Sequence, residues 1–150
     1  MKFVLLLLLG TINMTTLNAQ SAEDSVKAVV NKMFEAMHNA DAESLKSTFS
    51  ESVVFQTIAT SKEGVVSVKT EDPKGFIDFV GKEKKSVLDE RISFETIKID
   101  GPLAVAWTPY KFYYNGTFSH CGVNSFQLVR TNGAWKIQYI IDTRRKSGCE

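Results

Sequence analysis

Metal-binding and cross-linking residues are scarce in this chain. Its 150 residues include two cysteines, two histidines and three prolines. His38, His120, Cys121 and Cys149 show no spacing typical of metal ligands, so no metal site and no cofactor is expected. After the first residues, no apolar run is long enough to cross a bilayer. The sequence has no internal repeat, low-complexity tract or linker.

The chain also lacks an excess of charge of either sign. Eighteen Lys and Arg residues stand against 17 Asp and Glu residues, which gives a formal net charge of +1. A nearly neutral protein has no broad electrostatic attraction to nucleic acid or to anionic membranes. We therefore expect neither of them as a partner.

The N-terminus has the pattern of a secretory signal. Lys2 precedes an apolar run at 3–9 that is too short to span a bilayer, and the residues before Gln20 favour cleavage after Ala19. Residues 1–19 are therefore predicted to be a cleaved signal peptide, which makes the protein secreted or periplasmic, with no membrane attachment after cleavage. An uncleaved N-terminal anchor is the alternative. Residues 20–150 suffice for a single domain with one core.

Cys121 and Cys149 are the only cysteines of this chain. The oxidising compartment that export implies favours a disulfide between them. The alternative is that Cys121 is a small buried hydrophobic residue of a strand. The sequence leaves both open.

The N-terminal half is predicted to supply the helices. From residue 22 to residue 40, apolar side chains recur at spacings of three and four, the pattern of an amphipathic helix. Ser21 with Asp24 resembles an N-cap arrangement, Asp41 is the expected N-cap of a second helix, and Pro73 suits the first turn of a third. The predicted elements are helices at 22–40, 45–49 and 73–84, and strands at 52–60, 65–70 and 91–99.

Two hairpin turns mark the C-terminal third. Asn115 with Gly116, and Asn132 with Gly133, are the pairs that type I′ turns favour, because both central residues need a positive φ. The flanking segments at 105–113, 118–130 and 135–143 are rich in aromatic and β-branched residues. Three consecutive antiparallel strands are therefore predicted.

The register of these strands predicts which side chains share a face. Two-residue turns fix the pairing, and side chains alternate between the two faces. One face carries Lys136, Gln138, Asp142 and Arg144 on the last strand, so the other is expected to be buried. A slip of one residue or a bulge would exchange the faces. The predicted buried face holds Trp107 opposite Asn124, Lys111 opposite His120, Phe126 opposite Tyr139 and, on the same side, Tyr113.

Motifs on the last strands resemble a known superfamily. They are Val105-Ala106-Trp107, Pro109-Tyr110, Gly116, His120-Cys121-Gly122, Phe126, Leu128-Val129, Gly133, Trp135-Lys136-Ile137 and Asp142-Thr143-Arg144. With this order of elements, residues 20–150 resemble the nuclear-transport-factor-2-like superfamily of cystatin-like folds, and more narrowly its secreted bacterial lumazine-binding branch. The resemblance implies an α+β, cone-shaped roll. A strongly curved, mostly antiparallel sheet of about six strands would wrap around a long N-terminal helix, with two shorter helices, and the chain would form a homodimer.

A pocket between the sheet and the first helix is also implied by the resemblance. It would bind a small, partly aromatic or apolar molecule, so we predict a secreted small-molecule-binding protein rather than an enzyme. The first helix could add Met33, Met37 or His38, although His38 suits the surface near the helix C-terminus. The alternative is that the aromatic residues fill the core. The predicted ligand-binding residues are Trp107, Lys111, Tyr113, His120, Asn124, Phe126 and Tyr139.

Two other functions stay open. An isomerase- or cyclase-like enzyme would use His120 as acid or base, assisted by Asp142. The register places no carboxylate on the pocket face, and Asp142 reaches it only if the last strand is bulged. The Asp, Arg, Asp arrangement of related hydrolases has no match. The other function is a dimeric interaction module with a filled core, whose exposed face would carry Tyr110, Phe112, Tyr114 and Val123.

Overall fold

Residues 21–149, which the computed structural model describes, form three helices and seven strands. The helices are α1 (Ala22–His38), α2 (Ala42–Ser47) and α3 (Pro73–Lys82). The strands are β1 (Phe49–Thr60), β2 (Val66–Glu71), β3 (Leu88–Ile92), β4 (Thr96–Asp100), β5 (Leu103–Tyr114), β6 (Thr117–Thr131) and β7 (Ala134–Arg145).

N-cap side chains lie at the starts of the helices, as the sequence predicts. The Oγ of Ser21 accepts a hydrogen bond from the backbone N–H of Asp24 at 3.0 Å, which satisfies one of the free donors at the start of α1. Asp41 caps α2, and Asp72 caps α3. α1 ends at His38, slightly before the predicted end at residue 40.

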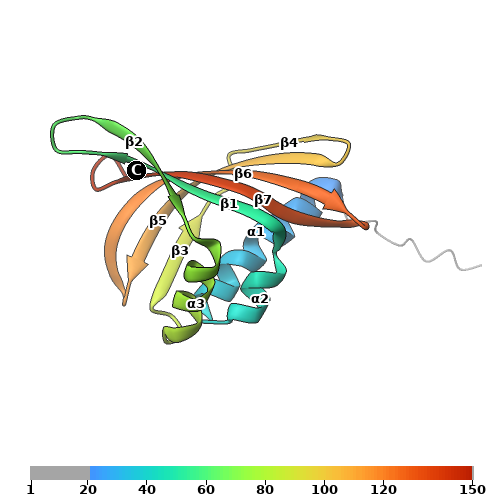
Figure 1. The fold of residues 1–150 in the computed structure, drawn as a ribbon, viewed down its shortest axis with the longest axis horizontal. Coiled ribbons are helices and arrows are strands. Elements are labelled where there is room, and N and C mark those ends of the chain that lie inside the picture. Colours follow the sequence, from blue (N-terminus) through green and yellow to red (C-terminus); the bar gives the residue numbers. More distant parts are fainter. Residues whose placement is uncertain (1–20, 150) are drawn as a thin grey trace, which may run out of the picture.

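A single sheet curves over the helices (Figure 1). Its strand order is β2-β1-β7-β6-β5-β3, with β4 also paired to β5, and only β1 and β7 run parallel. The predicted α+β roll, with a strongly curved, mostly antiparallel sheet around a long N-terminal helix, is confirmed. The strand predicted at 91–99 is in fact two strands, β3 and β4. They pair with different parts of β5, so the sheet has seven strands where about six were predicted.

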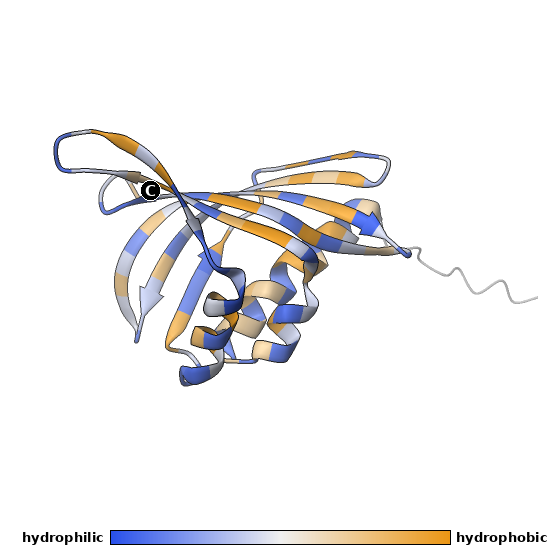
Figure 2. Ribbon diagram, in the orientation of Figure 1, coloured by the Kyte–Doolittle hydropathy of each residue, from blue (hydrophilic) through white to orange (hydrophobic). Residues whose placement is uncertain are grey.

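The core lies between α1 and the concave face of the sheet. Apolar residues alternate with polar ones along the strands (Figure 2), as expected for strands with one buried face. Phe34 of α1 packs edge-on against Phe126 of β6, with ring centroids 6.1 Å apart. The fully buried core residues include Val26, Val30, Leu45, Leu128 and Ile137.

Two β-bulges decide which side chains of the last strands face the helices. Both predicted turns are confirmed, and pairing starts at each turn in the predicted register. The register then shifts by one residue at Ser119 of β6 and at Gln138 of β7, neither of which has a partner in the pairing. Such a bulge moves every later side chain to the other face. The predicted faces are therefore right for the inner residues of β6 but wrong for β5 and for β7 beyond Gln138.

A disulfide fastens the C-terminal tail to the outer face of the sheet. Cys121 of β6 is 1% exposed and is bonded to Cys149, with the two Cα atoms 5.8 Å apart. The Nε of Arg145 donates to the backbone oxygen of Gly148 at 3.1 Å and supports the turn of the tail. Of the two alternatives that the sequence left open, the structure has the bridge.

The predicted signal peptide, residues 1–19, lies outside the described residues. From residue 21 to residue 149, no helix is both long and apolar enough to cross a membrane. The boundary between leader and domain therefore stays a prediction.

Candidate functional site

A cavity of about 580 Å³ opens between the concave face of the sheet and helices α1 and α3. This volume lies within the range of ~300–1,000 Å³ that is usual for small-molecule pockets. Polar side chains from the strands gather at one part of its wall, and apolar side chains form the rest. The apolar wall includes Met33, Met37, Phe55, Phe76, Leu88 and Phe112.

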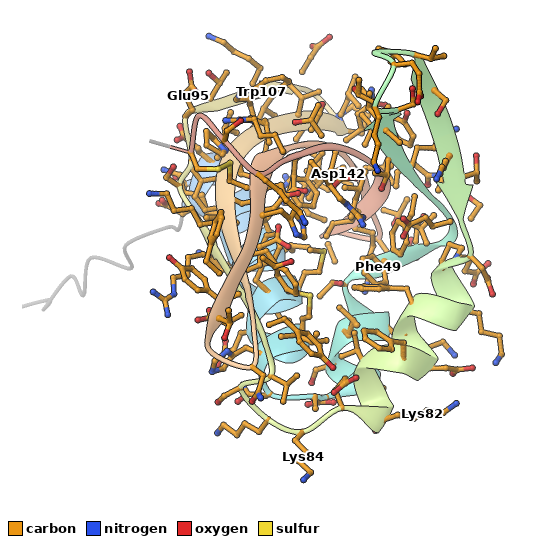
Figure 3. All side chains as sticks on the ribbon, turned by 90° about the vertical axis from the view of Figure 1, so that its left-hand side faces the viewer. Phe49, Lys82, Lys84, Glu95, Trp107 and Asp142 are labelled. Atoms are coloured by element: carbon orange, nitrogen blue, oxygen red, sulfur yellow. A yellow bond between two sulfur atoms is a disulfide. The ribbon has the colours of Figure 1, made fainter. Side chains whose placement is uncertain are left out.

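Asp142 of β7 is the centre of the polar part. It is 8% exposed and lies in the interior of the molecule, whereas Trp107 and Glu95 lie at the periphery (Figure 3). Its carboxylate accepts hydrogen bonds from Thr57 Oγ1 at 2.5 Å, from Arg144 Nε at 2.8 Å and from the Tyr110 hydroxyl at 3.2 Å. Because a buried carboxyl group is costly without partners, these three donors stabilise Asp142 at this position.

Arg144 connects Asp142 to a second carboxylate. Its Nη2 donates to Thr57 Oγ1 at 2.9 Å and lies 3.4 Å from Glu71 Oε1, which the β1–β2 hairpin supplies. Burial opposes the positive charge, but the hydrogen bond and charge of Asp142, with the charge of Glu71, outweigh it and raise the pKa of Arg144. No Asp, Arg, Asp arrangement could be matched in the sequence. The fold nevertheless places Arg144 between two carboxylates, those of Asp142 and Glu71.

Glu90 of β3 lines the cavity beside Asn124 of β6. The Nδ2 of Asn124 donates to Glu90 Oε1 at 2.8 Å. Burial raises the pKa of Glu90 to about 7; the charge of Asp142 adds to this rise, while Asn124 and Arg144 oppose it. Near neutral pH the carboxyl group is therefore divided between its protonated and ionised forms. Such a group in a cavity is typical of a functional site.

Tyr110 of β5 supplies a neutral hydroxyl to the same region. The single proton of this hydroxyl is shared between Asp142 Oδ2, 3.2 Å away, and the backbone oxygen of Thr143, 3.0 Å away. Burial raises the pKa of Tyr110, and the charges of Asp142 and Glu90 raise it further. The phenol therefore stays protonated and acts as a hydrogen-bond donor.

His120 of β6 stands beside this cluster without a carboxylate partner among the described residues. Its Nδ1 lies 3.0 Å from Ser119 Oγ, and its ring contacts those of Tyr110 and Phe112, with centroids 5.7 Å and 5.1 Å away. Burial lowers the pKa of His120, and the charge of Arg144 lowers it further. The imidazole is therefore neutral near pH 7. Across residues 21–149 no three His, Cys, Asp or Glu side chains are grouped so as to hold a metal ion.

Solved structures share this architecture. A nuclear-transport-factor-2-like protein of unknown function from Shewanella baltica matches with a TM-score of 0.64 at 16% identity, over 83% of this chain and 94% of the other. A nuclear-transport-factor-2-like protein with a cystatin-like fold from Novosphingobium aromaticivorans matches with a TM-score of 0.65 at 12% identity, over 84% and 83%. A cystatin-like domain of unknown function from Nostoc punctiforme matches with 0.62 at 17% identity, over 84% and 78%.

The chain has the nuclear-transport-factor-2-like fold. The resemblance noted in the sequence is thus supported at the level of the fold. Neither the protein-family models nor the curated proteins contain a match. The narrower assignment to the lumazine-binding branch stays a prediction.

Within this nuclear-transport-factor-2-like fold, the predicted ligand-binding residues separate into two groups. His120 and Asn124 line the cavity, from the face of β6 on which the sequence placed them. Phe126 lies on the same face but is fully buried against Phe34, so it belongs to the core. Like Phe126, the residues Trp107, Lys111, Tyr113 and Tyr139 do not line the cavity.

The bulge at Ser119 turns the predicted β5 residues outward. Trp107 is 46% exposed, and Lys111 pairs with Cys121 on the outer face. The ring of Tyr113 is covered by the guanidinium of Arg91, 4.3 Å from the ring centroid. The prediction that these three side chains face the pocket is therefore wrong.

On β7, the bulge at Gln138 acts in the same way. Tyr139 turns outward, where its hydroxyl donates to Gln56 Oε1 at 2.6 Å. Asp142 and Arg144 turn inward, so the prediction that no carboxylate faces the pocket is wrong. A bulge in the last strand was the stated condition under which Asp142 would reach the pocket face, and the structure has one at Gln138.

Other side chains that line the cavity were missed or placed on the wrong face. Tyr110 and Phe112 were assigned to an exposed dimer face, but the shift of β5 places both in the cavity wall. Glu90 was missed because the predicted strand began at residue 91. The alternation of Leu88, Glu90 and Ile92 was the signal that could have found it.

The end of α1 contributes as the sequence partly anticipated. Met33 and Met37 line the cavity. His38 does not; its Nε2 lies 3.1 Å from Ser86 Oγ, at the loop that leads into β3.

Proposed function

We propose that this protein binds a small molecule that is mostly apolar and has one polar end. The observation that carries the proposal is the cavity of about 580 Å³, with apolar walls and one polar region around Glu90, Asn124 and Asp142. Pockets that orient a small ligand combine a largely apolar lining with a few convergent polar groups. A core filled by aromatic side chains would leave no such volume.

A neutral fluorescent probe tests this proposal. N-phenylnaphthylamine should bind the purified protein at one site, and Met33→Trp, which fills part of the cavity, should weaken binding by about tenfold or more. The control is Phe118→Ala, which removes an exposed aromatic side chain outside the cavity and should leave the affinity unchanged. Absence of binding, or equal binding by the Met33 variant, would contradict the proposal.

A second candidate function is acid–base catalysis on a small carbonyl compound, with Glu90 as the proton carrier. It is favoured by a carboxyl group in the cavity whose pKa is raised to about 7 by burial, since a general base works best near the operating pH. His120 is a poorer candidate than the sequence suggested, because its ring contacts Ser119 and not Asp142. Proton–deuterium exchange at the α-carbon of a panel of cyclic ketones, followed by NMR, should be lost in Glu90→Gln.

Export and dimerisation belong to the same proposal. The signal-like N-terminus and the Cys121–Cys149 bridge both suit an oxidising, extracytoplasmic compartment. A homodimer is supported by apolar side chains exposed on the outer side of the sheet, Leu103 and Trp107, each 46% exposed. Light scattering of the mature chain should give twice the monomer mass, and Trp107→Glu should give the monomer.

A further inference from the structure

The charges that line the cavity are mostly negative. Glu71, Asp72, Glu90 and Asp142 contribute carboxyl groups, and Arg144 is the cationic side chain among them. No lysine lines the cavity within the described part of the chain. A cleft with low-dielectric walls and an excess of one charge attracts ligands of the opposite charge.

Arg144 is already paired with acidic side chains of the cavity. Its Nε donates to Asp142, and its Nη2 is shared between Thr57 and Glu71. Two carboxylates therefore share one guanidinium, and the group as a whole carries a net negative charge. A carboxylate or phosphate ligand would have to approach two acids to reach the Nη1 of Arg144, the one nitrogen of this guanidinium for which no partner is found among residues 21–149.

The polar wall next to this group offers acceptors. Glu90 Oε1 receives the amide of Asn124, whereas for Glu90 Oε2 and Asn124 Oδ1 no donor is found among residues 21–149. Asn124 is 6% exposed, so its free oxygen has only the cavity to face. The nearby hydroxyl of Tyr110 is already engaged with Asp142 and Thr143. A ligand that satisfies this wall must bring hydrogen-bond donors.

The rest of the wall suits a cation attached to hydrocarbon. The ring of Phe112 and the thioethers of Met33 and Met37 face the same space, and aromatic faces attract cations. We propose that the ligand is a cationic amphiphile, an aryl or alkyl amine whose ammonium group donates to Glu90 and Asn124 while its hydrocarbon lies against α1. This inference rests on the proposed small-molecule-binding function and specifies the class of ligand.

Binding of an amine is then linked to the protonation of Glu90. The charged or titratable groups around Glu90 are Asp142 and Arg144 on β7, Tyr110 on β5 and His120 on β6, while α1 presents methionines. Because the pKa of Glu90 is about 7 without ligand, an ammonium group must displace its proton at acid pH. We expect about tenfold weaker binding near pH 6 than near pH 8. Protonation of His120 at acid pH would weaken it further.

Three probes that share one hydrocarbon skeleton test the ligand class. Naphthylethylamine, naphthylethanol and naphthylacetate are titrated into the mature protein by calorimetry, near pH 8 and near pH 6. We expect the amine to bind at least about tenfold more tightly than the alcohol near pH 8, and the acid to bind most weakly.

Glu90→Gln should reduce the affinity for the amine to that for the alcohol and remove its pH dependence. Glu95→Gln, at an exposed carboxylate outside the cavity, is the matched control and should change neither.

The outcomes separate this inference from the function on which it rests. If the alcohol or the acid binds as tightly as the amine, the proposed ligand class is wrong and cavity binding stands. The ligand class is also wrong, and cavity binding stands, if N-phenylnaphthylamine binds and naphthylethylamine does not. If none of these compounds binds, both the ligand class and the proposed function are wrong.

Discussion

Gly122 lies directly opposite Tyr110 in the β5–β6 pairing, and the tyrosine ring occupies the space where a side chain at 122 would stand. A Cβ built on Gly122 would come within 2.8 Å of Tyr110 Cε1 and 1.8 Å of the backbone oxygen of Thr143. The missing side chain lets Tyr110 reach across β6 to Asp142 on β7. A glycine on one strand thus makes possible a polar contact between its two neighbours.

Gly122→Ala should therefore disrupt the polar part of the cavity. We expect the free energy of unfolding to fall by at least about 2 kcal/mol, because the added methyl group overlaps backbone and displaces the tyrosine hydroxyl from its acceptors. Urea unfolding followed by circular dichroism measures the loss. Gln127→Ala, at an exposed position of the same strand, is the control and should stay within about 0.5 kcal/mol of the unmodified protein. Equal effects of the two changes would contradict the packing described here.

Glu90 should make the folded protein less stable as the pH rises. Its pKa is about 7 in the folded chain against an ordinary value of 4.5, so the fold favours the protonated form. The stability that Glu90 contributes is complete below about pH 4.5 and is lost as the pH rises through 7, by at most about 3 kcal/mol.

Glu90→Gln replaces the protonated acid by a neutral amide and removes this dependence. The variant should match the unmodified protein near pH 4.5 and become more stable than it near pH 8. Urea unfolding at a series of pH values gives the difference curve, in which contributions from other groups such as His120 largely cancel. A difference that does not change with pH would show that Glu90 is ionised normally in the fold.

The disulfide should be a main source of stability for the C-terminal tail and for β6. Cys121 and Cys149 are 28 residues apart, and in the chain-entropy model a loop of this size stabilises the folded state by about 3–4 kcal/mol. Cys149→Ala should lower the free energy of unfolding by about that amount without reductant. Ser147→Ala is the control in the same tail. If a reductant destabilises the unmodified protein and the Cys149 variant equally, the bridge is not formed in solution.

The elements of this fold follow from local signals in the sequence. Ser21 and Asp41 are N-caps that indicate where two helices begin. The Asn-Gly pairs at 115–116 and 132–133 form the turns of two hairpins, and all four residues have a positive φ. These are interactions between residues a few positions apart, so a single sequence contains them. The break between β3 and β4 was not predicted, because it is defined by pairing with a distant strand.

The site was harder to predict than the fold, for a geometric reason. Ser119 and Gln138 are ordinary strand residues, and nothing in the local sequence marks either as a bulge. Each bulge nevertheless exchanges the faces of the strand beyond it. His120 and Asn124 were placed correctly because β6 has no bulge between His120 and the turn that joins it to β7; Trp107 and Tyr139 were not, because they lie beyond the shifts.

Asp142 and Glu71 share Arg144, but they should differ in their contribution to stability. The side chain of Asp142 is 10% exposed and has three donors, whereas that of Glu71 is 41% exposed. Asp142→Asn places an amide against donors that need an acceptor, and we expect a loss of about 2–4 kcal/mol in the free energy of unfolding. Glu71→Gln affects a solvent-screened pair and should cost less than about 1 kcal/mol.

Combining Asp142→Asn with Arg144→Met should cost less than the sum of the two single changes, because they disrupt the same contact. Urea unfolding of the four variants near pH 7 measures all these values, and equal losses at positions 142 and 71 would mean that Asp142 is not buried among its donors.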